Sequence, residues 1–203
     1  MLLYLFVMAL YSAAYGQYNF LMPLDMGRVH GENGALLFGT VSSLNCIVVV
    51  LFTPLITRLF RRMVETKKLL AGQLLVAVGY ALFLSLLGHI PVYYLAMLLF
   101  TWGEIFSTIS AGPYLSRRIP ASHRGRINGL MTVAYTAITG GIDIAVGRFY
   151  DRAGSRQTWV LILGVAAASA AVTVLLGALD RKAYPKLYRR AGEPEPRETA
   201  SGG

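Results

Sequence analysis

The chain has 203 residues, of which 55% are hydrophobic and 14% are charged, and its formal net charge is +9. Because a soluble domain carries roughly 25% charged residues, this composition is typical of an integral membrane protein. The basic balance would also suit a nucleic-acid-binding protein, and only the position of the charges along the chain separates the two classes.

Six apolar stretches are long enough for helices that cross about 30 Å of hydrocarbon at about 1.5 Å per residue. They cover about residues 2–22, 34–57, 69–88, 91–113, 129–147 and 158–179. We therefore expect an all-α membrane protein with six transmembrane helices. The first stretch lacks the basic start of a secretory signal peptide and stays apolar to Met22, so we expect no cleavage there.

The positions of Lys and Arg indicate the orientation. The second and fourth loops and the C-terminal tail hold five, four and six of them, whereas the first, third and fifth loops hold one, none and three. The positive-inside rule then places both termini in the cytoplasm of a multi-pass protein of a cell membrane, which we expect to be bacterial. Because the charge follows loop parity and forms no single patch, we expect no nucleic-acid partner.

Residues 181–203 are basic at first and then rich in Gly, Pro and Glu. The basic part, from Lys182 to Arg190, could lie on the membrane surface as an amphipathic segment or act as a solvated anchor. From Ala191 to Gly203 no large apolar side chain is present, and we expect this part to be disordered.

Two acidic residues lie inside apolar stretches. Glu104 is near the middle of the fourth, where a charge costs about 2.5–3.5 kcal/mol and normally faces a bundle interior or a wet cavity. It could exchange a proton or be a buried, hydrogen-bonded acid. Asp143, near the outer end of the fifth stretch, could carry transport chemistry or form an ion pair with Arg148 or Arg152.

Polar side chains gather on one face of the first and fourth stretches. At about 100° per residue, the tyrosines of the first stretch share a narrow face, and threonines of the fourth lie near Glu104. We expect a substrate cavity to be lined by Tyr11, Tyr15, Tyr18, Asn19, Thr101 and Thr108. Tyr4 and Tyr18 could instead anchor the helix at the membrane surface, and Thr hydroxyls often bond their own helix.

The polarity repeats after three helices. The first and fourth are the most polar, the second and fifth are intermediate, and the third and sixth are almost wholly apolar. This pattern predicts a 3+3 inverted repeat in which the first and fourth line a cavity, the second and fifth flank it, and the third and sixth face lipid. Gly140, Gly141 and Gly147 would let the fifth helix approach a neighbour closely.

Three segments resemble a known family. They are Tyr15–Leu24 (YGQYNFLMPL), Pro54–Gly79 (PLITRLFRRMVETKKLLAGQLLVAVG), and Gly103-Glu104 with the loop IPASHRGRINGL, where Pro120, Arg124, Gly125 and Arg126 form a Pro-x-x-x-Arg-Gly-Arg pattern. They are similar to the C-terminal six-helix half of a major facilitator superfamily (MFS) transporter of the multidrug/proton antiporter-like kind. The Gly-x-x-x-Asp signature of that family is not kept.

The resemblance implies proton-coupled efflux of small amphipathic or cationic molecules by alternating access between this bundle and a second one. Glu104 and Asp143 would be proton-coupling candidates, and loop arginines would grip the cytoplasmic end of the bundle: Arg117, Arg118, Arg124 and Arg126. Because the family uses about twelve helices, the expected partners besides the lipid bilayer and substrate are a missing N-terminal half or a second copy. The alternative is a non-transporting membrane scaffold or an incomplete fragment that keeps the fold of an MFS half.

An enzyme is not expected. His30, His89 and His123 lie in separate loops, and no Ser/His/acid set can be assembled on one side of the membrane. We expect no cofactor and no metal site.

Overall fold

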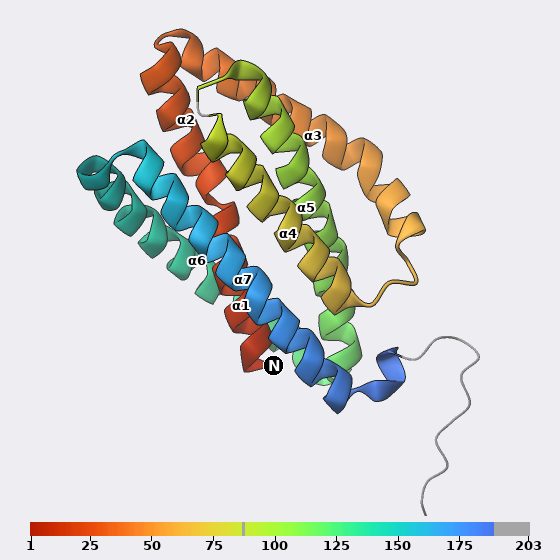
Figure 1. The fold of residues 1–203 in the computed structure, drawn as a ribbon. Coiled ribbons are helices and arrows are strands. Elements are labelled where there is room, and N and C mark those ends of the chain that lie inside the picture. The colour runs from red at the N-terminus through yellow and green to blue at the C-terminus, as the bar shows by residue number, and fades with distance from the viewer. Residues whose placement is uncertain (87, 189–203) are drawn as a thin grey trace, which may run out of the picture.

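A computed structural model describes residues 1–86 and 88–188, and the segment from Ala191 to Gly203, for which we expect disorder, lies outside them. The described chain is all helical, which confirms the predicted class (Figure 1). The helices are α1 (Leu2–Tyr15), α2 (Gln17–His30), α3 (Asn33–Leu59), α4 (Glu65–Ser85), α5 (Ile90–Arg118), α6 (Ala121–Ala153), α7 (Ser155–Ala183) and the short 3-10 helix η1 (Pro185–Tyr188).

Five of these helices, α3 to α7, are long and apolar enough to cross a membrane. The first apolar stretch is divided instead into α1 and α2, which have 14 residues each and follow one another directly. Helix α2 continues to His30, through residues whose polarity suggests a loop.

The division between α1 and α2 is a local break at Gly16. There the amide of Asn19 donates to the Gly16 carbonyl, three residues back, at 3.1 Å. The hydroxyl of Tyr80 on α4 donates to the Ala14 carbonyl at 2.6 Å and so satisfies a backbone acceptor at the break. Because an unpaired backbone group inside a membrane is costly, this contact from α4 stabilises the break.

The two ends of the bundle differ in charge. At one end α3 and α5 finish, α4 begins and α7 finishes, close to the N-terminus (Figure 1). The basic residues of segments 58–68, 117–126 and 181–186 belong to this end, which we call the basic end. The turns α2–α3, α4–α5 and α6–α7 lie at the other end.

Helices α4 and α5 approach each other closely near their middles. A Cβ atom on Gly72 would lie 2.7 Å from the Gly103 carbonyl oxygen, so only glycine allows this spacing. Above it, the rings of Tyr80, Phe83, Phe100 and Trp159 pack into one buried cluster. We predict close helix contact at Gly140 and Gly141, but a Cβ atom added to either would meet no atom of another described helix within 4 Å.

The exposed faces of the helices differ in polarity. Between Val160 and Leu179 every exposed residue of α7 is apolar, and its polar Ser169 and Thr173 point into the bundle. Helices α3 and α6 are less buried and carry polar side chains on their exposed faces, namely Thr40, Ser43, Asn128, Thr132 and Thr136.

Candidate functional site

Glu104 lies at a junction of three helices. The hydroxyl of Tyr15 on α1 donates to Glu104 Oε2 at 2.7 Å, and the amide of Asn45 on α3 donates to the same oxygen at 3.1 Å. The carboxylate is half-buried, and its second oxygen, Oε1, accepts no hydrogen bond from residues 1–86 or 88–188. One face of the carboxylate is therefore held by the protein and the other is available to a proton or a ligand.

Thr101 lies one helical turn before Glu104 on α5 and binds the same asparagine, Asn45. It is fully buried, its hydroxyl donates to the Met97 carbonyl at 2.7 Å, and it accepts the Asn45 amide at 2.9 Å. Asn45 thereby bridges Thr101 and Glu104, and its amide orientation is fixed by two acceptors. No described Lys or Arg pairs with Glu104, so the carboxylate is held by neutral donors alone.

The tyrosines of the predicted cavity form a continuous row of neighbouring rings, here called the stack, in which Tyr11 and Tyr15 lie parallel and Tyr18 is tilted against Tyr15. The ring centroids of Tyr11 and Tyr15 are 5.6 Å apart, and those of Tyr15 and Tyr18 are 4.9 Å apart. Tyr18 also lies 6.2 Å from the ring of Phe100. Because Tyr15 is both the middle ring and a donor to Glu104, the stack and the acid belong to one cluster, which we call the Glu104 cluster.

Two of the predicted cavity residues lie outside this cluster. The side chains of Asn19 and Thr108 are exposed and form no hydrogen bond within the described chain. Both would need a neighbour other than this bundle to bury them.

The hydrogen-bond partner of Asp143 is Gln17, which is not among the cavity residues that the helical spacing predicts. Gln17, only 1% exposed, donates through its side-chain amide to Asp143 Oδ1 at 2.9 Å. Neither Arg148 nor Arg152 forms an ion pair with Asp143 in the structure as described. The buried Oε1 of Gln17 has no donor among these residues, so the pair combines a half-buried carboxylate with an unsatisfied acceptor.

A third acid, Asp25, is missing from the sequence-based candidates. It is buried at the end of the bundle opposite the basic end, where Tyr150, Ser155 and Trp159 all donate to its carboxylate, Ser155 Oγ at 2.8 Å. The three donors come from α6 and α7, so Asp25 joins these helices to α2. A carboxylate with three donors is well satisfied, and this arrangement indicates a structural role.

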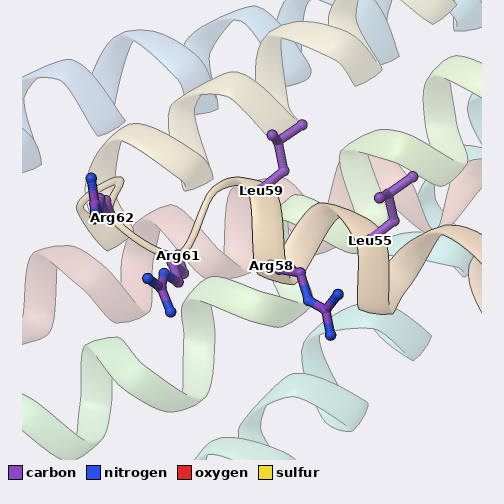
Figure 2. A pocket seen from close by; sticks show the side chains of 5 residues that line it. All are labelled: Leu55, Arg58, Leu59, Arg61 and Arg62. Atoms are coloured by element: carbon purple, nitrogen blue, oxygen red, sulfur yellow. The ribbon is translucent and has the colours of Figure 1, made fainter.

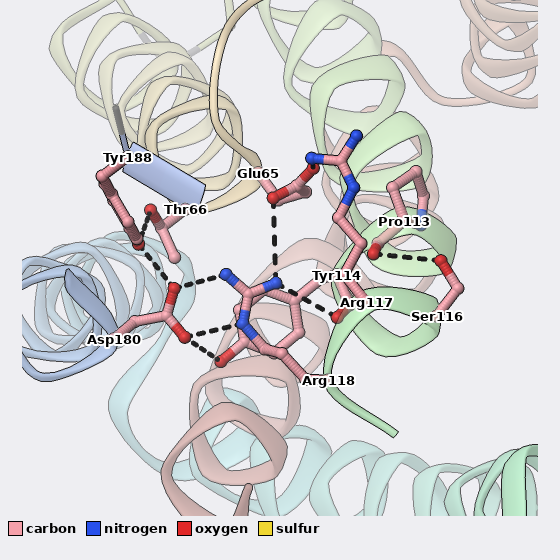
Figure 3. A network of polar contacts seen from close by, with 9 residues as sticks. All are labelled: Glu65, Thr66, Pro113, Tyr114, Ser116, Arg117, Arg118, Asp180 and Tyr188. Atoms are coloured by element: carbon pink, nitrogen blue, oxygen red, sulfur yellow. Dashed lines mark hydrogen bonds and ion pairs between the residues drawn. The ribbon is translucent and has the colours of Figure 1, made fainter. Parts of the chain in front are cut away.

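The basic end holds an ion-pair network (Figure 3). Arg118 on α5 forms ion pairs with Asp180 on α7 and, at 3.7 Å, with Glu65 on α4, and all three side chains are 2–3% exposed. Arg117 binds the other oxygen of Glu65 at 2.7 Å from a more exposed position. Two of the predicted loop arginines thus connect three helices.

Tyr188 of η1, which follows the last long helix, adds hydrogen bonds to this network. Its hydroxyl donates to Asp180 at 2.6 Å and lies 2.8 Å from the hydroxyl of Thr66 (Figure 3). Burial, together with the hydrogen bond to the Asp180 carboxylate, raises the pKa of Tyr188 to about 12. Tyr188 therefore remains a donor at neutral pH.

The other two loop arginines lie on the first turns of α6. Arg124 donates to the carbonyls of Ile119 at 3.1 Å and Ser116 at 2.5 Å, which are among the acceptors left open where α5 ends. Arg126 is exposed. Within the residues described, no group of three or more His, Cys, Asp or Glu side chains could hold a metal ion.

Comparison with known proteins identifies a family. A family model described as Major Facilitator Superfamily matches residues 1–142. This range includes the Glu104 cluster and all four predicted loop arginines. No curated protein and no solved structure matches the chain.

Proposed function

Because this chain belongs to the Major Facilitator Superfamily, we propose that it is one six-helix half of a secondary active transporter. In this proposal α1 and α2 together form the first of six membrane crossings, broken at Gly16. The basic end faces the cytoplasm, in accord with the positive-inside rule.

The proposed activity is proton-coupled efflux of small amphipathic or cationic molecules. The observation that carries it is the Glu104 cluster: a half-buried carboxylate with one oxygen held by Tyr15 and Asn45, the other oxygen open, and three stacked tyrosines beside it. Aromatic faces and a carboxylate attract a lipophilic cation, and no described arginine or lysine neutralises the acid. Protonation of Glu104 would weaken this attraction and leave only that of the aromatic faces, which couples proton uptake to substrate release.

Asp143 is the second proton-coupling candidate, and we assign it the lesser role. Its partner Gln17 holds one oxygen through an amide, as Asn45 does for Glu104, but no tyrosine of the stack donates to it. We propose that Asp143 tunes cation binding and that Glu104 carries the coupled proton.

A second six-helix bundle would cover the exposed face of α6 and that of α3 up to its last turns, which hold Leu55 and Leu59. The covered faces carry hydroxyl and amide groups among apolar side chains, whereas between Val160 and Leu179 the exposed face of α7 is wholly apolar. Polar groups are disfavoured against acyl chains, so α3 and α6 are better suited to protein or water and α7 to lipid. The open Gly140 and Gly141 on α6 would permit close approach of the second bundle.

Transport in everted membrane vesicles that contain the chain and its second bundle tests the activity, with tetraphenylphosphonium as the probe. We expect Glu104→Gln to abolish accumulation driven by a pH gradient but to keep exchange of the labelled cation without a gradient. Asp143→Asn should lower the apparent affinity and keep the coupling. Intact gradient-driven accumulation in the Glu104→Gln variant would refute the proton role.

Cross-linking through Cys46 tests the assembly. Cys46 is exposed on α3, one of the two helices proposed to face the second bundle. In native membranes a bifunctional maleimide should yield a product larger than the chain, of twice its mass if the partner is a second copy. Cys46→Ser is the control, and the absence of any product at saturating reagent would count against the interface.

A further inference from the structure

A second candidate binding site lies at the basic end, on the last turns of α3 and past the part of that helix that contributes Asn45 to the Glu104 cluster. It is an open pocket of about 350 Å³ around the last turns of α3 and the turn that follows. Five side chains line it, Leu55, Arg58, Leu59, Arg61 and Arg62 (Figure 2). We propose that this pocket binds the phosphate headgroup of an anionic phospholipid.

The charge of the pocket is not compensated within the bundle. Arg58, Arg61 and Arg62 are exposed, and none of them forms an ion pair with another described residue. The nearest acid along the chain, Glu65, is buried and already bound by Arg117 and Arg118. Three guanidinium groups within five positions therefore remain available to an anion.

The type of cation favours phosphate. A guanidinium group presents two parallel N–H donors that match two phosphate oxygens, and all three cations here are arginine. In Figure 2 the guanidinium groups of Arg58 and Arg61 extend to the same side of the ribbon, as shared contact with one headgroup requires.

The leucines favour a lipid over a soluble phosphate. Leu55 and Leu59 are one helical turn apart and are 57% and 70% exposed. They belong to the last turns of a helix long and apolar enough to span a membrane, and the arginines follow directly. An apolar surface followed by a basic one matches the order of acyl chains and headgroup in a leaflet, and basic clusters beside a spanning helix bind anionic lipids.

The site is tested by native mass spectrometry of the full chain in detergent, with phosphatidylglycerol and phosphatidylcholine of identical acyl chains. The wild-type chain should retain phosphatidylglycerol preferentially. Replacing Arg58, Arg61 and Arg62 together with Gln should weaken phosphatidylglycerol binding on the order of 100-fold at low ionic strength, about fivefold per arginine. The side chains are exposed, so the variant should keep the circular dichroism spectrum of the wild type.

The matched control replaces three exposed arginines at the other end, Arg148, Arg152 and Arg156, with Gln. It removes the same charge and should keep the phosphatidylglycerol preference. Equal loss in both variants would overturn the proposal, because the effect would then be one of net charge alone.

Two further arms separate lipid from free phosphate. Replacing Leu55 and Leu59 with Ser should weaken binding of long-chain phosphatidylglycerol and leave binding of inorganic phosphate unchanged. If inorganic phosphate at millimolar concentration displaced the lipid, or if the leucine variant bound lipid as the wild type does, the pocket would be a general anion site and the lipid assignment would be wrong.

Discussion

The hydroxyl of Tyr15 donates a 2.7 Å hydrogen bond to the carboxylate of Glu104, which ties α1 to α5 inside the membrane-spanning part of the bundle. The ring of Tyr15 also lies between those of Tyr11 and Tyr18. A movement of these rings would therefore change the hydrogen bond to Glu104, the residue that we propose to carry the proton.

This bond leads to a prediction for Tyr15→Phe. A donor to a carboxylate favours its ionised form, and a hydrogen bond to a charged group contributes about 1.5–3 kcal/mol. Without the hydroxyl, Glu104 Oε2 keeps only the Asn45 amide as a donor. We expect the apparent affinity for tetraphenylphosphonium, measured from the concentration dependence of vesicle transport, to fall about tenfold or more.

Tyr18→Phe is the matched control, because the Tyr18 hydroxyl does not donate to Glu104 while its ring belongs to the same stack. Its apparent affinity for tetraphenylphosphonium should be close to that of the wild type. Equal losses in both variants, or none in Tyr15→Phe, would mean that the hydrogen bond does not act on the carboxylate that binds the cation.

The ion pairs of the basic end give a prediction on stability. Arg118→Met leaves Asp180 and Glu65 buried without their shared cation, a change that typically costs about 3–5 kcal/mol. Arg117→Met removes a cation whose side chain is 53% exposed and should cost about 1 kcal/mol or less. Unfolding in mixed detergent micelles measures the loss of unfolding free energy in each variant. Equal losses would show that burial does not determine how much each ion pair contributes to stability.

Tyr188 gives a prediction on pH dependence. Its pKa is raised from 10.0 to about 12, so the folded state favours the protonated hydroxyl. The stability that this provides is complete below pH 10 and is lost as the pH rises through about 12. The Tyr188→Phe variant lacks the titrating hydroxyl, so its unfolding free energy should fall less than that of the wild type between these pH values. Parallel pH profiles of unfolding would contradict the assignment.

Asp25 gives a prediction about the opposite end of the bundle. In Asp25→Asn the amide loses acceptor capacity for Tyr150, Ser155 and Trp159, and a buried unsatisfied group costs about 1–3 kcal/mol. We expect a loss of about 2–3 kcal/mol in unfolding free energy. Asp151→Asn, whose side chain is 75% exposed, is the control and should change it by less than about 1 kcal/mol. Similar values for both would exclude a structural role for Asp25.

Several features could be predicted because they depend on local composition. The apolar stretches identify the helices of the all-α fold, and the family model matches the chain that carries the quoted motifs. The expectation that Glu104 faces a polar neighbour followed from the cost of a charge in hydrocarbon, and Tyr15 and Asn45 are such neighbours.

Other features depend on distant parts of the chain. The donors to Asp25 lie 125 to 134 positions away, so nothing near Asp25 marks it as buried. A straight helix of about 100° per residue places Gln17 opposite the tyrosines. The break at Gly16 begins a new helix at Gln17, whose side chain reaches Asp143 on α6. The hydroxyls of Thr132 and Thr136 donate to carbonyls of their own helix at 3.0 Å, as threonines in membrane helices often do, so their polarity alone did not identify a cavity.

We expect Glu104 to release a proton when a cation binds. Adding tetraphenylphosphonium to the purified, assembled transporter in weakly buffered detergent solution with a pH indicator measures this release. The wild type and Asp143→Asn should release protons on binding, whereas Glu104→Gln should bind the cation without release. Equal proton release from Glu104→Gln and the wild type would contradict the proton role of Glu104.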